Sequence, residues 1–253
     1  MRIKYFAQRN FTELRRDPLS YIFCLGFPII MLFVMTIINN SIPKEANMTI
    51  FQIQSLGPAI IIFGLTFVML FTCLTISNDR SSAFLVRLYA SPMQGIDFLA
   101  GYTLPMIVIA IAQCVITLAT SVAIGLFNNY TFNIGYLLLS ILFLLPTMVL
   151  FIAFGLLFGS LFNEKASPPL CSIIICACGM LGGIWMDLDT LGGGFAKVCK
   201  MFPFYHGVKV AREVAIGHIE DAMPSFLITF AYSIVVFITA VFVFRSKMQK
   251  DLK

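Results

Sequence analysis

Long stretches without any charged residue divide this chain, and they limit its possible folds more than any other feature. Asp, Glu, Lys and Arg are absent from residues 18–43, 46–78, 98–163, 166–186 and 224–244. Only 11% of the residues are charged, whereas soluble domains have about 25%. A helix needs about 20 consecutive apolar residues to cross a bilayer, and each stretch is that long. The sequence therefore predicts an all-α membrane protein.

Six membrane-spanning helices follow from where these stretches begin, end and break. Residues 98–163 are too long for one span, and the turn-rich sequence FNNYTFN at 127–133 divides them into two. The predicted spans lie near residues 19–39, 52–77, 99–126, 135–161, 166–186 and 224–244. An even number of spans places both termini on one side, and residues 1–253 are predicted to form a single transmembrane domain.

The distribution of basic residues predicts the orientation. With the N-terminus in the cytoplasm, twelve of the 17 Lys and Arg residues fall on the cytoplasmic side and the remaining five fall outside. Cytoplasmic loops of membrane proteins carry an excess of Lys and Arg. We therefore expect both termini in the cytoplasm, and we interpret the net charge of +5 as a sign of membrane topology.

The sequence lacks the motifs of several functional classes. It contains no G-x-x-x-x-G-K-[ST] phosphate loop and no H-E-x-x-H zinc motif. Its seven cysteines show no spacing typical of a metal site or a disulfide framework. All charged residues fall in loops or at span ends, which argues against an ion-coupled pump. We expect no catalytic residue, metal or cofactor in this chain, and no nucleic acid as a partner.

Two segments outside the spans have helical patterns of their own. Residues 1–18 are basic with scattered aromatic residues, which is typical of an interfacial helix on anionic headgroups. Its basic residues are Arg2, Lys4, Arg9, Arg15 and Arg16. Residues 187–223 are broken by glycines and Pro203, and we expect an outer re-entrant hairpin of two short helices there.

Residues 79–92, DRSSAFLVRLYASP, form a third short amphipathic segment, between the second and third spans. Asn78 or Asp79 can cap a helix there, and Pro92 ends it. Phe84 and the two arginines of the segment share one helical stripe. Two interpretations remain open. The helix lies flat on the membrane, or it docks on a partner with Phe84 as an anchor and the arginines as orienting charges.

Several motifs in this order resemble the membrane subunit of type-two ABC exporter permeases, the ABC-2 family. They are LRRDP at the end of the basic helix, DRSSAFLVRLYASP after the second span, and GGIWMDLDTL and FPFYHGVKVAREVAIG before the last span. The resemblance covers nearly the whole chain. It is closest to the drug-exporter branch. Ala83 stands where a glycine is common, and IWMDLDTLGGGF lacks the prolines usual in the family.

The resemblance implies a function, partners and site residues. Residues 79–92 would be a coupling helix in a cleft of a separate ATPase, and the contacts would come from Asp79, Arg80, Phe84, Arg87, Leu88 and Pro92. Two permeases, as a homodimer or a related heterodimer, would bind two ATPase subunits, which would hold ATP and Mg²⁺. The complex would export an amphipathic or hydrophobic substrate across a bacterial cytoplasmic membrane. The alternatives are polysaccharide or teichoic-acid export, and a membrane anchor or receptor that transports nothing.

Uncharged residues inside the spans are the candidates for the substrate path. These candidates are Gly64, Gln113, Thr117 and Gly183. The alternative is that the polar side chains form hydrogen bonds between helices, each contributing about 0.6 kcal/mol.

Overall fold

The computed structural model describes residues 2–43, 49–82 and 95–251, and the described residues form helices without a strand. This confirms the predicted all-α class. In order, the elements are α1 (Arg2–Arg16), α2 (Pro18–Tyr21), η1 (Ile22–Gly26), α3 (Phe27–Ser41), η3 (Thr49–Phe51), α4 (Ile53–Ser81), α6 (Gly95–Phe127), α7 (Ile134–Phe143), α8 (Leu145–Leu161), α9 (Ser167–Leu181), α10 (Leu188–Leu191), α11 (Gly193–Cys199), α12 (Pro203–Ile216) and α13 (Ile219–Asp251).

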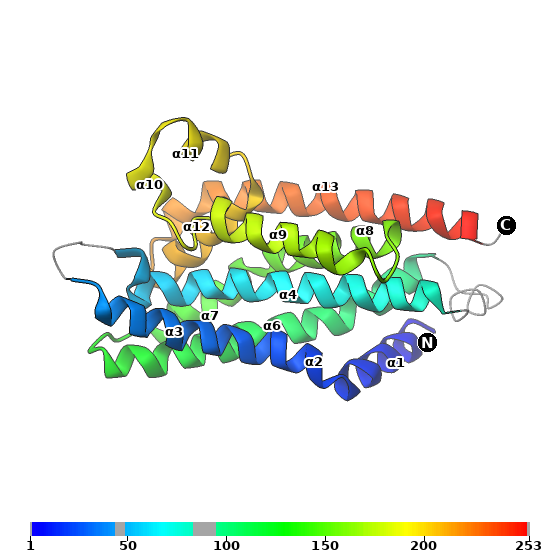
Figure 1. The fold of residues 1–253 in the computed structure, drawn as a ribbon, viewed down its shortest axis with the longest axis horizontal. Coiled ribbons are helices and arrows are strands. Elements are labelled where there is room, and N and C mark those ends of the chain that lie inside the picture. The colour runs from blue at the N-terminus through cyan, green and yellow to red at the C-terminus, as the bar shows by residue number, and fades with distance from the viewer. Residues whose placement is uncertain (1, 44–48, 83–94, 252–253) are drawn as a thin grey trace.

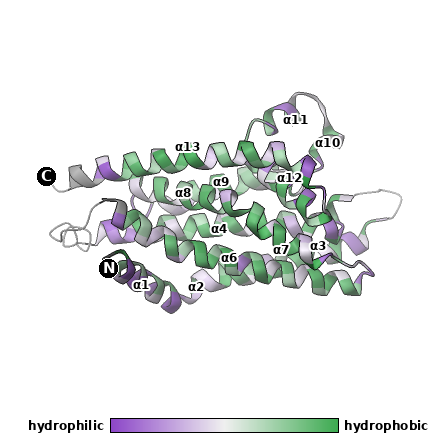
Figure 2. Ribbon diagram, turned by 180° about the vertical axis from the view of Figure 1, so that it is seen from behind, coloured by the Kyte–Doolittle hydropathy of each residue, from purple (hydrophilic) through white to green (hydrophobic). Residues whose placement is uncertain are grey.

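The long helices lie side by side along one axis, and both termini lie at the same end of the bundle (Figure 1). Apolar residues line the middle of the bundle, whereas polar residues gather at its ends and on α1 (Figure 2). This distribution is the one that a bilayer imposes on a helical protein. We call the end that carries both termini the terminal end, and the opposite one the far end.

Five helical segments in the described part of the chain are long and apolar enough to span a membrane. They are Pro18–Ser41, Ile53–Ser81, Asp97–Phe127, Ile134–Leu161 and Ile219–Lys247. They coincide with five of the six predicted spans. The predicted span at 166–186 is the shorter apolar helix α9, which has 15 residues. At 1.5 Å per residue, α9 is about 22 Å long, which is less than the roughly 30 Å hydrocarbon core.

Helix α4 is the centre of the bundle, and two glycines of α8 allow the closest approach to it. A Cβ atom on Gly155 would lie 2.6 Å from the carbonyl oxygen of Met69, and one on Gly159 would lie 2.7 Å from that of Cys73. Glycines four residues apart form one small face, along which two helix backbones can approach in a membrane. Any larger residue at either position would push α8 away from α4.

Part of the segment at 187–223 is buried in the protein, which the sequence does not indicate. Helix α12 packs against α4, α7 and α13, and Phe204, Val208 and Ala211 on it are buried. Its end is held by Gly217, whose φ of 92° favours glycine and where a Cβ atom would lie 2.6 Å from the Tyr136 ring. The expected pair of short helices is present as α11 and α12, but α12 lies inside the bundle.

Candidate functional site

Helix α1 is docked on α6 by an aromatic side chain. Phe6 is 5% exposed, and its ring centroid lies 5.6 Å from that of Phe98 and 5.1 Å from that of Tyr102. A Cβ atom on Gly101 would collide with the Phe6 ring, so this glycine makes room for it. Asn10 Nδ2 donates to the Gly101 carbonyl oxygen at 3.0 Å. The face of α1 that carries Phe6, Asn10 and Leu14 is therefore covered by protein.

A partly buried ion pair joins α1 to the last turn of α4. Arg9 donates from Nη1 to Asp79 Oδ2 at 3.0 Å and from Nη2 to Oδ1 at 3.1 Å. Tyr102 Oη donates to Asp79 Oδ2 at 2.7 Å, and Arg9 also reaches Glu13 Oε1 at 2.6 Å. Asp79 is 5% exposed. We call Arg9, Glu13, Asp79 and Tyr102 the charged cluster; two parallel N–H···O bonds give it a defined geometry.

Burial and the charged cluster have opposite effects on the pKa of Arg9. Partial burial by itself would lower the pKa of the guanidinium. The hydrogen bond to Asp79 and the negative charges of Asp79 and Glu13 act in the opposite direction and outweigh it, so the pKa of Arg9 is raised. A buried carboxylate without such a partner would be strongly destabilising.

The neighbouring residue, Arg80, joins the same turn of α4 to α8. Its Nη1 donates to the carbonyl oxygens of Gly159 at 3.0 Å and Phe162 at 3.4 Å, and also to that of Ser160. These are carbonyl groups at the C-terminal end of α8, which have no partner within their own helix and attract a positive charge. The last turn of α4 is thus bound to both α1 and α8.

The boundary of α4 changes the interpretation of the predicted coupling segment. Helix α4 continues to Ser81, so Asp79 and Arg80 belong to its last turn, and both side chains have partners within the chain. Residues 83–94 lie outside the described residues, and with them Phe84, Arg87, Leu88 and Pro92. The assignment of these four as ATPase contacts stays a prediction.

A cavity of 460 Å³ lies between α1 and the end of α4, beside the charged cluster. It is lined by Arg9, Asn10, Glu13, Leu14, Asp17, Thr75, Asn78, Asp79 and Ser82. Three of these residues are acidic and one is basic. Asp17 also caps α2, because its carboxylate accepts from the Leu19 amide at 3.0 Å and from Ser20 Oγ at 2.6 Å. The cavity is a recess lined mostly by polar residues.

The basic residues predicted for the interfacial helix have two different surroundings. Lys4, Arg15 and Arg16 are exposed on α1, as a helix on a membrane surface requires, and Arg2 begins the helix. Arg9 instead turns toward Asp79, which is 70 positions away in the sequence. No local pattern connects residues so far apart, so sequence reasoning assigned Arg9 to the membrane surface.

Three of the four residues predicted for the substrate path meet in a contact between α4 and α6. Gln113 Nε2 donates to the Ile61 carbonyl oxygen at 3.4 Å and to Thr117 Oγ1 at 3.2 Å. A Cβ atom on Gly64 would collide with the Gln113 amide. Gln113 and Thr117 are fully buried. The bond from Gln113 to Ile61 joins two helices, as the alternative expects, whereas the bond to Thr117 lies within α6.

Gly183 lies apart from these three residues, in the turn that follows α9. Its φ of 70° is in the left-handed region, and a Cβ atom there would lie 2.9 Å from Leu188 Cδ1. Both the backbone angle and the space therefore favour glycine at this position.

A buried histidine at the far end was not predicted as a structural contact. His206 on α12 places Nε2 2.9 Å from the Lys200 carbonyl oxygen and Nδ1 3.2 Å from Ser225 Oγ on α13. The carbonyl can only accept, so Nε2 carries the proton and Nδ1 accepts from the serine. Burial lowers the pKa of His206, and the charge of Lys209 also lowers it, whereas the bond to the Lys200 carbonyl raises it. We call His206, Ser225 and the Lys200 carbonyl the neutral contact.

One group of possible metal ligands is found among the described residues. Glu213, His218 and Asp221 bring their ligand atoms within 4.8 Å of one another where α12 meets α13. His218 and Asp221 are exposed, and His218 Nδ1 lies 3.5 Å from Glu213 Oε2. An exposed group of this kind forms pairs with its own members and with water.

The family model described as ABC-2 family transporter protein matches residues 36–242. No curated protein matches the chain. The matched residues contain Asp79 and Arg80 but not α1, so Arg9 reaches into the matched region from outside it.

Proposed function

The chain belongs to the ABC-2 family of transporter proteins, and we propose that it is the membrane subunit of an ATP-driven exporter. As an ABC transporter permease of several spans, it works with an ATPase partner. We propose two permease copies with two cytoplasmic ATPase subunits, which bind the ATP and Mg²⁺. In this proposal the membrane is the bacterial cytoplasmic membrane, both termini are cytoplasmic, and the cargo is amphipathic or hydrophobic.

The observation that carries the proposal is the Arg9–Asp79 ion pair. It fixes α1 to the last turn of α4, immediately before the segment that we assign to the ATPase. Helix α4 in turn contacts α3, α6, α8, α9 and α12. A displacement of the coupling segment by the ATPase would therefore be passed to most of the bundle, because packed helices move as rigid bodies.

A row of aromatic rings supports a path for hydrophobic cargo beside α4. The Phe27 centroid lies 5.0 Å from that of Phe67, and the Phe63 centroid lies 5.2 Å from that of Trp185. Phe23, which is 39% exposed, stacks on Phe67 at 6.0 Å. The row joins the first span, α4 and the turn after α9. We assign the path to this row, and a structural role to Gly64, Gln113 and Thr117.

Co-purification of the ATPase with tagged permease variants tests the coupling assignment. Interface anchors often contribute 2 kcal/mol or more, so Phe84→Ala should weaken ATPase binding roughly thirtyfold. Arg87→Glu should be worse than Arg87→Ala if the facing surface is acidic. Arg245→Glu, an exposed charge reversal on α13, is the matched control. Full recovery of ATPase with both Phe84→Ala and Arg87→Glu would leave only a helix on the membrane surface.

Transport assays and topology reporters test the remaining parts. Phe67→Ala should slow ATP-dependent transport of a hydrophobic dye in proteoliposomes without loss of ATPase binding, whereas Phe242→Ala, on an exposed site of α13, should not. A reporter that is active only outside the membrane should stay silent when fused after Lys253. Activity of that reporter would reverse the proposed orientation.

A further inference from the structure

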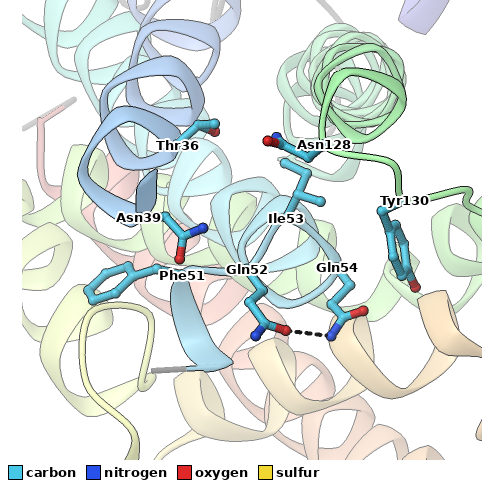
Figure 3. A pocket seen from close by; sticks show the side chains of 8 residues that line it. All are labelled: Thr36, Asn39, Phe51, Gln52, Ile53, Gln54, Asn128 and Tyr130. Carbon is cyan, nitrogen blue, oxygen red and sulfur yellow. Dashed lines mark hydrogen bonds between the residues drawn. The ribbon is translucent and has the colours of Figure 1, made fainter. Parts of the chain in front are cut away.

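A cavity of 260 Å³ lies at the far end of the bundle, where three segments distant in sequence meet. Thr36 and Asn39 come from α3, Phe51 from η3, and Asn128 and Tyr130 from the loop after α6. The first residues around the start of α4 complete the lining: Gln52, Ile53 and Gln54. Figure 3 shows these side chains around one recess. We call it the amide pocket.

Among the described residues, the polar lining of the amide pocket is uncharged and dominated by carboxamides. Asn39, Gln52, Gln54 and Asn128 each carry one, and none of the eight lining residues is acidic or basic. Gln54 Nε2 donates to Gln52 Oε1 at 2.8 Å (Figure 3), which holds the two side chains relative to each other. Each carboxamide presents two N–H donors and one accepting oxygen, so the lining offers donors and acceptors together.

Part of this hydrogen-bonding capacity is unused within the described residues. The bond between the two glutamines uses Gln54 Nε2 and Gln52 Oε1. The other two side-chain atoms, Gln52 Nε2 and Gln54 Oε1, have no protein partner among the described residues. Asn128 Nδ2 donates to the Ile124 carbonyl oxygen at 3.1 Å, which leaves Oδ1 to accept. Donor and acceptor atoms from two separate segments are thus available to one ligand.

Two aromatic side chains stand on different sides of the carboxamides. Phe51 and Tyr130 lie at opposite edges of the recess in Figure 3. The Tyr130 ring packs edge to face on Phe132, with centroids 4.8 Å apart, so its position is held by a neighbour. Aromatic rings give an apolar face to a ligand whose edges are polar.

We infer that the amide pocket binds an uncharged, hydroxyl-rich ligand the size of one sugar ring, such as the sugar of a neutral glycoside. Hydroxyl groups donate and accept at once, as the carboxamides do. A charged ligand would lose its hydration without meeting an opposite charge among the lining residues. The volume is below the roughly 300 Å³ at which pockets for drug-sized ligands begin. The inference does not depend on transport, and the pocket lies at the opposite end from the charged cluster.

Ligand-observed NMR on the full chain in lipid nanodiscs tests the inference, with methyl β-glucoside as the probe. Nanodiscs leave both ends of the bundle accessible. A ligand of this size is expected to bind with a Kd on the order of 1 mM. Gln54→Met and Asn128→Leu each replace an amide by an apolar group of similar shape, and each should weaken binding about tenfold. Gln8→Met makes the same change on an exposed site of α1 and should bind as the unaltered chain does.

Two further probes define the outcomes. Methyl glucuronide has the same ring with a carboxylate and should bind at least about tenfold more weakly; cyclohexanol, which has one hydroxyl, should not compete. Saturable glucoside binding that both amide variants weaken supports the inference. Absence of glucoside binding, equal binding by Asn128→Leu, or equal binding of cyclohexanol would overturn it. Asn128 is exposed on a loop, so this variant keeps the test available if Gln54→Met fails to fold.

Discussion

Polar contacts join the helices at each end of the bundle, and the contacts at one end are charged whereas those at the other end are neutral. At the terminal end, the charged cluster joins α1, α4 and α6 through a full ion pair around a carboxylate that is 5% exposed. At the far end, the neutral contact joins α12 to α13 through an imidazole, a hydroxyl and a carbonyl. The charged cluster bridges elements that are far apart in the sequence, whereas the neutral contact bridges two consecutive helices. Asp79, His206 and Ser225 are buried.

The difference concerns what happens when a contact is broken. A buried charge that loses its partner is strongly destabilising, so the charged cluster holds one geometry. A neutral hydrogen bond contributes only about 1 kcal/mol, because water replaces it. We therefore expect the terminal end to move as a unit when the ATPase displaces it, whereas the far end rearranges more easily. Four measurements of stability test this comparison.

The largest effect is expected for Asp79→Asn. The substitution removes the charge that holds Arg9, and breaking a buried pair costs about 3 kcal/mol or more of unfolding free energy. We expect the lower end of that range, because the Arg9 side chain is 29% exposed and can still reach Glu13. Unfolding in detergent micelles measures it. Glu13→Gln is the same change on a half-exposed carboxylate and should cost at most about 0.5 kcal/mol; equal costs would refute the central role of Asp79.

The next effect is expected for Tyr102→Phe. The phenol donates to Asp79 at 2.7 Å, and hydrogen bonds to charged groups contribute about 1.5–3 kcal/mol. The ring itself stays, so its packing on Phe6 is kept. Tyr5→Phe removes a hydroxyl from a side chain that is 69% exposed and should leave the unfolding free energy unchanged. If the two variants unfold alike, the phenol does not support the ion pair.

A smaller effect is expected at the far end for Ser225→Ala. The serine is 3% exposed and donates to a neutral imidazole, so its loss should cost about 1 kcal/mol. Ser233→Ala, on the same helix, removes a hydroxyl that donates to the Phe230 carbonyl oxygen of its own helix, and it serves as the comparison. A cost as large as that of Asp79→Asn would remove the contrast between the two ends.

The smallest effect near neutral pH comes from His206. Its pKa is lowered in the folded state by burial, so the unfolded chain binds more protons in the interval between the two pKa values. Stability should therefore begin to fall as the pH drops through about 6.5, the ordinary value for histidine, and should fall until the pH is below the folded pKa. Arg9 stays charged throughout this range. In His206→Gln this pH dependence should disappear; an unchanged pH profile would mean that another group causes it.

The chain's hydropathy and turns predicted most of the helices. The charge-free stretches located five long spans and the shorter α9, because charges are costly in a bilayer and interrupt each span at its ends. FNNYTFN correctly marked the turn between α6 and α7, and the glycines and Pro203 marked the limits of α11 and α12. These features depend only on the solvent that each residue prefers and on local backbone preferences.

The contacts of the site depend on distant residues and could not be predicted in this way. Arg9 and Asp79 are separated by 70 positions. The Phe6 ring can occupy its position only because Gly101 has no side chain. Nothing near Asp79 in the sequence distinguishes the last turn of α4 from the first turn of a coupling helix. Only the packing of α1 on α6 brings the guanidinium to this carboxylate.

Hydropathy alone does not predict which span is buried at the centre of the bundle. The segments Pro18–Ser41, Ile53–Ser81 and Ile219–Lys247 have the same mean hydropathy of 2.5 in their most apolar windows. Yet 83% of that window is buried in Ile53–Ser81, against 17% in each of the other two. Lipid tails are as apolar as a protein interior, so hydropathy determines that all three are helices of a membrane protein. Which of them lies at the centre is decided by side-chain fit, through contacts such as those at Gly155 and Gly159.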